Sequence, residues 1–205
     1  LLWTGGYGLL FVLLGGCALM LARNASAPRA AQNREAPARR SALWWMWLAF
    51  IPSGLMLATT LFITTDIMPM PLLWVLPLAL YLLSFTIAFS ARSGLADFVA
   101  IIAPYLLVPA AIALFVGQAL PLTVSAGILL VALFAISVAC HLKIYQSRPA
   151  ASQLTGFYLA LATGGALGGL FCALVAPLLF DWMYEFPLLL FAAAVTLLAG
   201  FSLLV

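Results

Sequence analysis

Long apolar stretches separated by short polar connections dominate the chain. Seven stretches approach the length of about 20 residues that a helix needs to cross the hydrocarbon core of a bilayer. They are residues 1–22, 43–63, 72–89, 98–116, 122–140, 157–180 and 187–205. In lipid every backbone polar group has to be paired within its own segment, which helices achieve and open strands do not. The pattern predicts an all-α, polytopic membrane protein with seven transmembrane helices.

The composition agrees with this prediction. Hydrophobic residues make up 67% of the 205 residues and charged residues only 6%, whereas a soluble domain carries about 25% charged residues. Such a chain has too few polar groups to cover its apolar surface, so we expect a lipid bilayer around it. The formal net charge of +3 gives no reason to expect a nucleic-acid partner, because in a membrane protein the distribution of charge matters more than its sum.

The charged residues divide the connections into two sets. The connections after the first, third and fifth stretches hold all the basic residues, which are Arg23, Arg29, Arg34, Arg39, Arg40, Arg92, Lys143 and Arg148. The connections after the second, fourth and sixth stretches hold no Lys or Arg and carry Asp66, Asp181 and Glu185 in short turns. The positive-inside rule puts the basic connections in the cytoplasm. The N-terminal end of the first stretch is then outside, and the C-terminus is cytoplasmic.

Residues 23–42 form a long polar connection that is rich in Ala, Pro, Arg, Asn and Ser. We expect an irregular cytoplasmic linker between one helix, 1–22, and a six-helix region, 43–205. Its arginines are expected to act as topology determinants; the alternative is contact with anionic lipid headgroups. These arginines are Arg23, Arg29, Arg34, Arg39 and Arg40. The tryptophans that follow, Trp44, Trp45 and Trp47, are expected to form an aromatic belt at the membrane interface.

The sixth stretch contains two interleaved pairs of glycines in the segment LATGGALGGLF. Gly164 and Gly168 are four residues apart, as are Gly165 and Gly169, so the pairs occupy adjacent strips of one helix face. Small residues at this spacing allow a second membrane helix to approach closely. The glycines do not form a dinucleotide-binding motif, which requires a strand before them. We therefore expect them to serve helix packing.

Few residues offer chemistry. The sole histidine, His141, ends the fifth stretch, and without a second ligand at useful spacing it is expected to be an interfacial hydrogen-bonding residue. The cysteines Cys17, Cys140 and Cys172 are scattered singly, which favours buried thiols over a disulfide or zinc site. The sequence shows no catalytic constellation, and we expect neither a cofactor nor a metal.

Asp66 is a second candidate polar residue, in the segment TTDIMPMPLLWVLP. Asp66 and the two threonines before it, Thr64 and Thr65, are expected to hydrogen-bond the backbone of an external turn; the alternative is contact with a substrate or ion. Three prolines follow, Pro69, Pro71 and Pro77. The first two are expected in the turn, and the third is expected to bend the helix of the third stretch by removing the partner of the residue 73 carbonyl.

Several stretches resemble the bacterial fused MFS/spermidine synthase (spermidine synthase-like) membrane proteins. The resemblance rests on TTDIMPMPLLWVLPLALYLLSFTIAF, CHLKIYQSRP, LTGFYLALATGGALGGLFCALVAPLLFDWMYEFP and LLWTGGYGLLFVLLGGCALML, and so runs along essentially the whole chain. It implies an MFS-like second half with one preceding helix, which closes a first repeat, in the inner membrane of a bacterium. Parallel repeats share their orientation, and the topology from the charges agrees with this.

The chain departs from that family at three polar positions. Family members tend to carry an acidic residue where Lys143 or its neighbour Leu142 stands, a Glu where Gly156 stands and an Asn where Cys172 stands. The family's cytoplasmic synthase-like domain and most of its first repeat are not in this sequence. Two explanations stand: a fragment of a longer protein, or a shortened homologue.

These observations favour a non-catalytic integral membrane module. Its expected role is that of a scaffold or accessory subunit that packs against other membrane helices, as an oligomer or with a membrane-protein partner. One alternative, implied by the resemblance, is the membrane half of a spermidine synthase-like aminopropyltransferase. A second alternative is a half-transporter of MFS type.

Overall fold

The computed structural model describes residues 39–66, 74–90, 94–116, 119–180 and 184–201, together with isolated positions between Gly8 and Met20. The chain divides into two compact units, Leu1–Glu35 and Ala36–Val205, and the helices below belong to the second. Several predictions lie outside the described residues: the helix 1–22 as a whole, the linker up to residue 38, the two prolines of the external turn, and Arg92 and Asp181.

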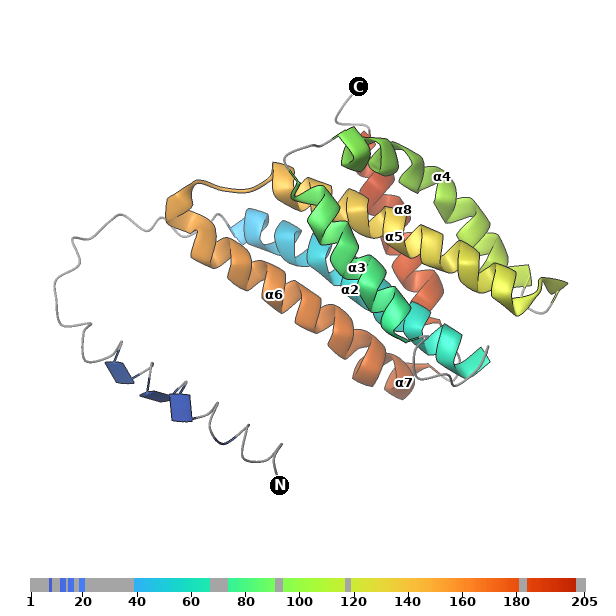
Figure 1. The fold of residues 1–205 in the computed structure, drawn as a ribbon, viewed down its shortest axis with the longest axis horizontal. Coiled ribbons are helices and arrows are strands. Elements are labelled where there is room, and N and C mark those ends of the chain that lie inside the picture. Colours follow the sequence, from blue (N-terminus) through green and yellow to red (C-terminus); the bar gives the residue numbers. More distant parts are fainter. Residues whose placement is uncertain are drawn as a thin grey trace. The chain divides into compact units, whose positions relative to one another are not determined.

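The described residues of the second unit form helices joined by short turns (Figure 1). Its elements are α2 (Arg39–Asp66), α3 (Val75–Ala88), α4 (Gly94–Val116), α5 (Leu122–Gln146), the 3₁₀ turn η2 (Ala151–Gln153), α6 (Leu154–Leu170), the π-helical turn η3 (Phe171–Val175), α7 (Ala176–Leu179) and α8 (Glu185–Phe201). No strand occurs among these residues, which confirms the all-helical prediction for the part of the chain that is described.

Four helical segments are long and apolar enough to cross a membrane: Ser41–Thr65, Gly94–Val116, Leu122–Gln146 and Ala151–Leu179. Two shorter apolar helices, Val75–Ala88 and Glu185–Ala199, accompany them. The apolar helices suggest a membrane location, as the sequence predicts. A count of seven spans stays a prediction.

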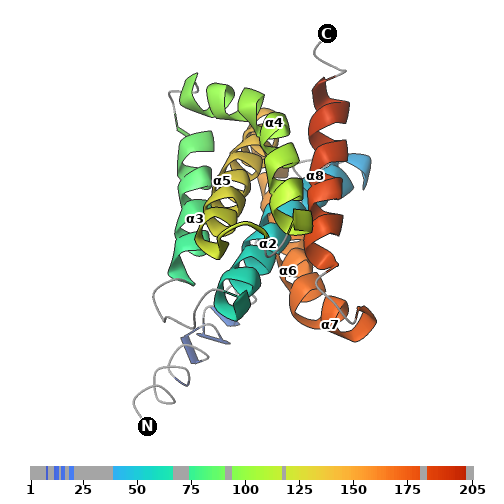
Figure 2. The ribbon, with the colours of Figure 1, turned by 90° about the vertical axis from the view of Figure 1, so that its right-hand side faces the viewer.

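Helices α2 and α5 form the centre of the unit. Helix α2 packs against α6, α5, α8 and α3, and α5 packs against α4, α2 and α3. Leu48, Ile51 and Leu55 of α2 and Leu133 and Ile136 of α5 are among the fully buried side chains. Figure 2 shows α8 beside α4 on one side of this centre and α6 running past α2. Lipid tails are as apolar as these side chains, so close van der Waals packing and interhelical hydrogen bonds stabilise such a bundle.

The ends of two helices differ from the sequence prediction. Helix α5 continues to Gln146 instead of ending at residue 140. Polar side chains do not by themselves end a helix, and two in its last turns, His141 and Lys143, bond inside the protein. Helix α8 begins at Glu185, whose side chain is buried. Glu185 therefore belongs to the first turn of α8 and packs against the bundle instead of lying in the preceding turn; its position on the external side stays a prediction.

Pro77 does not bend α3. The helix begins at Val75, so Pro77 lies in the first turn, where the backbone N–H groups have no helical partner in any case. The predicted kink was wrong for this reason, and Pro77 is one of the buried residues of α3.

Two long-range hydrogen bonds bring the described basic residues to one end of the bundle. Trp45 Nε1 donates to Ser147 Oγ at 3.0 Å, which joins the start of α2 to the turn after α5. Lys143 Nζ donates to the carbonyl oxygen of Thr196 at 2.9 Å, which joins the end of α5 to α8. The first residue of α2, Arg39, and Arg148 therefore belong to the same end.

Candidate functional site

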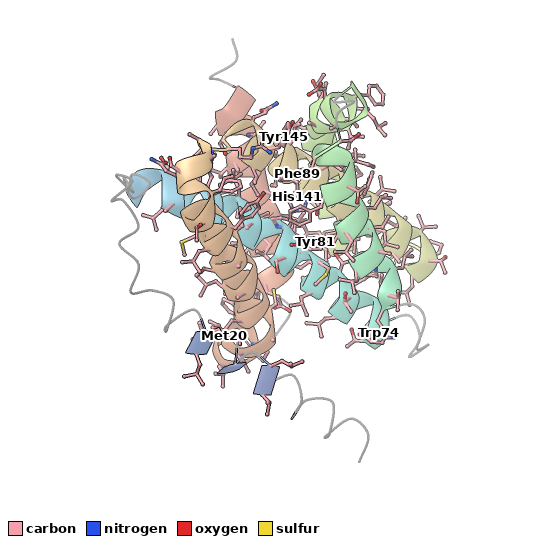
Figure 3. All side chains as sticks on the ribbon, turned by 60° about the vertical axis from the view of Figure 1, so that its left-hand side comes forward. Met20, Trp74, Tyr81, Phe89, His141 and Tyr145 are labelled. Carbon is pink, nitrogen blue, oxygen red and sulfur yellow. The ribbon has the colours of Figure 1, made fainter. Side chains whose placement is uncertain are left out.

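His141 lies between α5 and α3, and it is fully buried. Its Nδ1 is 2.8 Å from Ser84 Oγ of α3. Figure 3 shows Tyr145, Phe89, His141 and Tyr81 in succession along the contact between the two helices. The sequence predicted His141 as a hydrogen-bonding residue at the interfacial end of the fifth stretch, and its contact with Ser84 agrees with the hydrogen bonding. The longer α5 instead carries it into the packed interior.

Aromatic rings surround the imidazole of His141. The ring of Phe85 stacks on it with centroids 3.5 Å apart and planes at 24°. The ring of Tyr81 meets it edge-on, with centroids 5.4 Å apart. Phe85 and Tyr81 are four residues apart and so lie on the same face of α3. The imidazole is thus held by one hydrogen bond and two ring contacts.

The bonds of Ser84 fix the tautomer of His141. Ser84 Oγ also lies 2.6 Å from the backbone carbonyl oxygen of Tyr81, to which it donates. A hydroxyl group has a single proton, so Ser84 cannot fully donate to both the carbonyl and the imidazole. Both contacts are satisfied when Nδ1–H of His141 donates to Ser84 Oγ. In that arrangement Nε2 carries a lone pair and acts as an acceptor.

Four buried side-chain polar atoms have no hydrogen-bond partner among the described residues. They are His141 Nε2, Ser137 Oγ, Ser125 Oγ and Thr59 Oγ1. The first three belong to α5, and His141 and Ser137 are one helical turn apart. Such atoms are rare in native interiors, because an unmet hydrogen-bonding group in an apolar setting is costly.

Asp66 does not share a site with His141. Asp66 is the last residue of α2, whereas the Trp45–Ser147 bond places the end of α5 beside the start of α2. The expected turn bonds of the two neighbouring threonines were also wrong. Thr64 Oγ1 donates to the carbonyl of Thr60 at 2.9 Å and Thr65 Oγ1 to that of Leu61 at 2.8 Å. Threonine in a helix commonly bonds back to the preceding turn in this way.

The glycine strips of α6 differ in their surroundings. A Cβ on Gly164 would collide with the backbone of Met46, and one on Gly168 with the backbone of Phe50. Gly165 has open space around it, and its carbonyl accepts a 2.8 Å hydrogen bond from Ser53 Oγ. One strip therefore lies in backbone contact with α2 of the same chain.

Two further features escaped the sequence reading. Trp45 is buried and bonded to Ser147, so its ring packs in the core, whereas Trp44 and Trp47 are exposed. Thr196 has two long-range partners. Its Oγ1 accepts a 2.9 Å hydrogen bond from Trp47 Nε1, and its carbonyl oxygen accepts the bond from Lys143 Nζ. A buried tryptophan N–H usually finds a hydrogen-bond acceptor. The tryptophans in the sequence therefore indicated that acceptors would lie near them, but not which residues these would be.

The π-helical turn η3 surrounds Cys172, at the position where the resembling family tends to have Asn. Cys172 is buried, and its Sγ lies 3.3 Å from the carbonyl oxygen of Gly54. π-Helical turns widen a helix locally and are frequent at functional sites.

Within the described ranges, no three His, Cys, Asp or Glu side chains come together as metal ligands would. No family model, curated protein or solved structure matches the chain.

Proposed function

We propose that the chain is a non-catalytic integral membrane module that acts as a scaffold or accessory subunit in a larger complex. The module binds its partner, another membrane helix, through the outer face of α4. The supporting observation is the position of Tyr105, an exposed tyrosine midway along a helix long enough to span the bilayer.

Helix α4 has two contrasting faces. Small residues fill the inner face, among them Ala96, Ala103, Ala110 and Ala113. Large side chains occupy the outer face at alternating spacings of three and four residues: Phe98, Ile101, Tyr105, Val108, Ile112 and Phe115. Residues at this spacing share one face of the helix, so a single partner helix can contact all of them.

Tyr105 distinguishes this face from a surface that meets only lipid tails. Its side chain is 70% exposed, and in a membrane tyrosine is normally enriched at the interfaces and not at mid-depth. Residue 109 is proline, so the Tyr105 carbonyl also lacks its usual helical donor. A hydroxyl and a carbonyl in hydrocarbon favour a protein partner that supplies hydrogen bonds.

The test is the size of the complex extracted from native membranes in mild detergent. We expect wild-type chain in a particle larger than one copy. Tyr105→Phe keeps the ring and removes the hydroxyl, and should lower the association constant about fivefold, as for one lost interhelical hydrogen bond. Tyr158→Phe is the matched control, since Tyr158 is exposed on α6. A monomeric wild type, or a Tyr105→Phe variant that associates like the control, would overturn the proposal.

A half-transporter of MFS type is the second candidate. The unpartnered polar atoms of α2 and α5 favour it, because polar groups inside a membrane bundle commonly mark a pathway. Substrate-dependent uptake into proteoliposomes that is lost in His141→Phe would select this function over the scaffold. The membrane half of an aminopropyltransferase rests on the sequence resemblance alone, and a synthase-like domain in the same reading frame would support it.

For the location we propose the bacterial inner membrane, with seven spans, the N-terminal end outside and the C-terminus in the cytoplasm. The gathering of the described basic residues at one end of the bundle supports this orientation. Reporter fusions at Val205 test it: a fluorescent cytoplasmic reporter should be active there and a periplasmic phosphatase inactive. The reverse result would refute the orientation.

A further inference from the structure

We propose that His141 Nε2 and Ser137 Oγ form a buried binding subsite for one small hydrogen-bond donor, of which water is the smallest, reached from the C-terminal end of α5. This site goes beyond the proposed scaffold role and does not depend on it.

The first argument is the pairing of two unmet polar atoms. Both residues are fully buried, and neither atom has a hydrogen-bond partner among the described residues. They stand four residues apart on α5, so they share a face of the helix. Side chains of a helix lean toward its N-terminus, which tilts the imidazole of His141 toward Ser137. Buried waters typically occupy such positions, where they bind polar groups that otherwise lack partners.

The second argument concerns the kind of ligand. Because Ser84 gives its proton to the Tyr81 carbonyl, Nδ1 of His141 carries the ring proton and Nε2 is an acceptor. The Ser137 hydroxyl can donate or accept. A molecule that donates to Nε2 and accepts from Ser137 completes both groups at once. Water has this combination, and so does a small alcohol.

The third argument is the way in. His141 precedes the end of α5, Gln146, by five residues, a distance of about 7.5 Å along a helix. Between the imidazole and that end, Phe89 packs edge-on against Tyr145, with ring centroids 5.2 Å apart. The guanidinium of Arg148 lies 5.5 Å from the Tyr145 ring. Figure 3 shows Tyr145 and Phe89 in this position. A rotation of the Tyr145 side chain would open the subsite toward the basic end of the bundle.

His141 is the only histidine of the chain, which makes the test specific. Protein labelled with ¹⁵N-histidine, purified through a tag without histidine and placed in lipid nanodiscs, gives signals from this imidazole alone. We expect Nδ1 protonated, Nε2 in the chemical-shift range of a hydrogen-bonded acceptor, and transfer of magnetisation from water to the Nε2 side of the ring. A protonated Nε2, or a bare Nε2 without transfer from water, would overturn the proposal.

Two serine variants separate the subsite from general hydration. Ser137→Ala should weaken the water transfer to the ring about fivefold, the effect of one lost hydrogen bond. Ser125→Ala should leave the transfer unchanged, because Ser125 is also buried and unpartnered on α5 but lies three turns farther from His141. Equal transfer of magnetisation in the two variants would show that the Ser137 hydroxyl does not bind the water beside His141, and would contradict the proposal. If Ser137→Ala does not fold, the wild-type spectrum decides alone.

Discussion

Trp45 Nε1 donates a 3.0 Å hydrogen bond to Ser147 Oγ across 102 residues of sequence. Ser147 Oγ in turn donates to the Ile144 carbonyl at 3.1 Å, and the Trp45 ring packs edge-on against Phe157 with centroids 5.0 Å apart. One side chain therefore connects α2, the end of α5 and the start of α6. This hydrogen bond holds the start of α2 beside the end of α5, and so places the basic residues of both helices at one end of the bundle.

A double-mutant cycle measures this bond. Trp45→Phe and Ser147→Ala should each destabilise the fold, and the cycle should give a coupling free energy of about 1 kcal/mol, the usual net value of a hydrogen bond. The measurement is reversible unfolding in mixed micelles. A coupling near zero would mean that water replaces the bond without loss.

The contact of α6 with α2 predicts opposite effects for neighbouring glycines. Gly164→Ala places a methyl group against the backbone of Met46, and because backbone cannot yield like a side chain, we expect a loss of about 2 kcal/mol. Gly165→Ala meets open space and should be neutral or stabilising by up to about 1 kcal/mol, since alanine favours helix. Both are read from unfolding curves. Equal effects would show that the two helices are not in backbone contact at Gly164.

The Lys143 bond to the Thr196 carbonyl predicts a local effect on α8. Lys143→Met removes the charged donor, worth about 1.5 kcal/mol, so the amides of the last turn of α8 should exchange with deuterium about tenfold faster. Lys143→Arg keeps a donor and should exchange more slowly than Lys143→Met. Mass spectrometry of peptides covering 192–200 checks this. Wild-type exchange in the methionine variant would show that the Trp47–Thr196 bond alone holds α8.

Burial of two thiols predicts their reactivity. Cys140 and Cys172 are both buried, and a thiol without access to reagent does not react. In a Cys17→Ser background, a membrane-permeant maleimide should label neither cysteine in the folded protein and both after denaturation. Labelling of Cys172 in the folded state would show that the π-helical turn opens.

Among the described residues, helices occupy every apolar stretch that the sequence predicted from residue 43 onward, because a long apolar segment pairs its backbone groups internally only as a helix. The sequence predicted the polar residues poorly. Helix ends were predicted from the change from apolar to polar residues, which put His141 at the interfacial end of the fifth stretch and Glu185 in a turn. Both side chains are buried. Their burial depends on a partner or a packed helix far away in sequence, and spacing along one helix does not reveal it.

Trp45 shows the same limit in a different form. Three tryptophans within four residues resemble an interfacial belt, yet a helix turns by about 100° per residue, so adjacent tryptophans face different surroundings. Trp45 faces Phe157 and the core, while Trp44 is exposed. The glycine spacing was more informative, because a four-residue repeat selects one face. It did not reveal that the facing helix is α2 of the same chain.

Photo-crosslinking from position 105 tests the scaffold account most directly. A benzoylphenylalanine replacing Tyr105 should form a covalent adduct with a protein in native membranes. The same probe replacing Phe191 of α8 is the control, because Phe191 is also aromatic and is 69% exposed, against 70% for Tyr105. The account predicts a protein adduct at position 105 and lipid adducts at position 191. Lipid adducts alone at position 105 would contradict it.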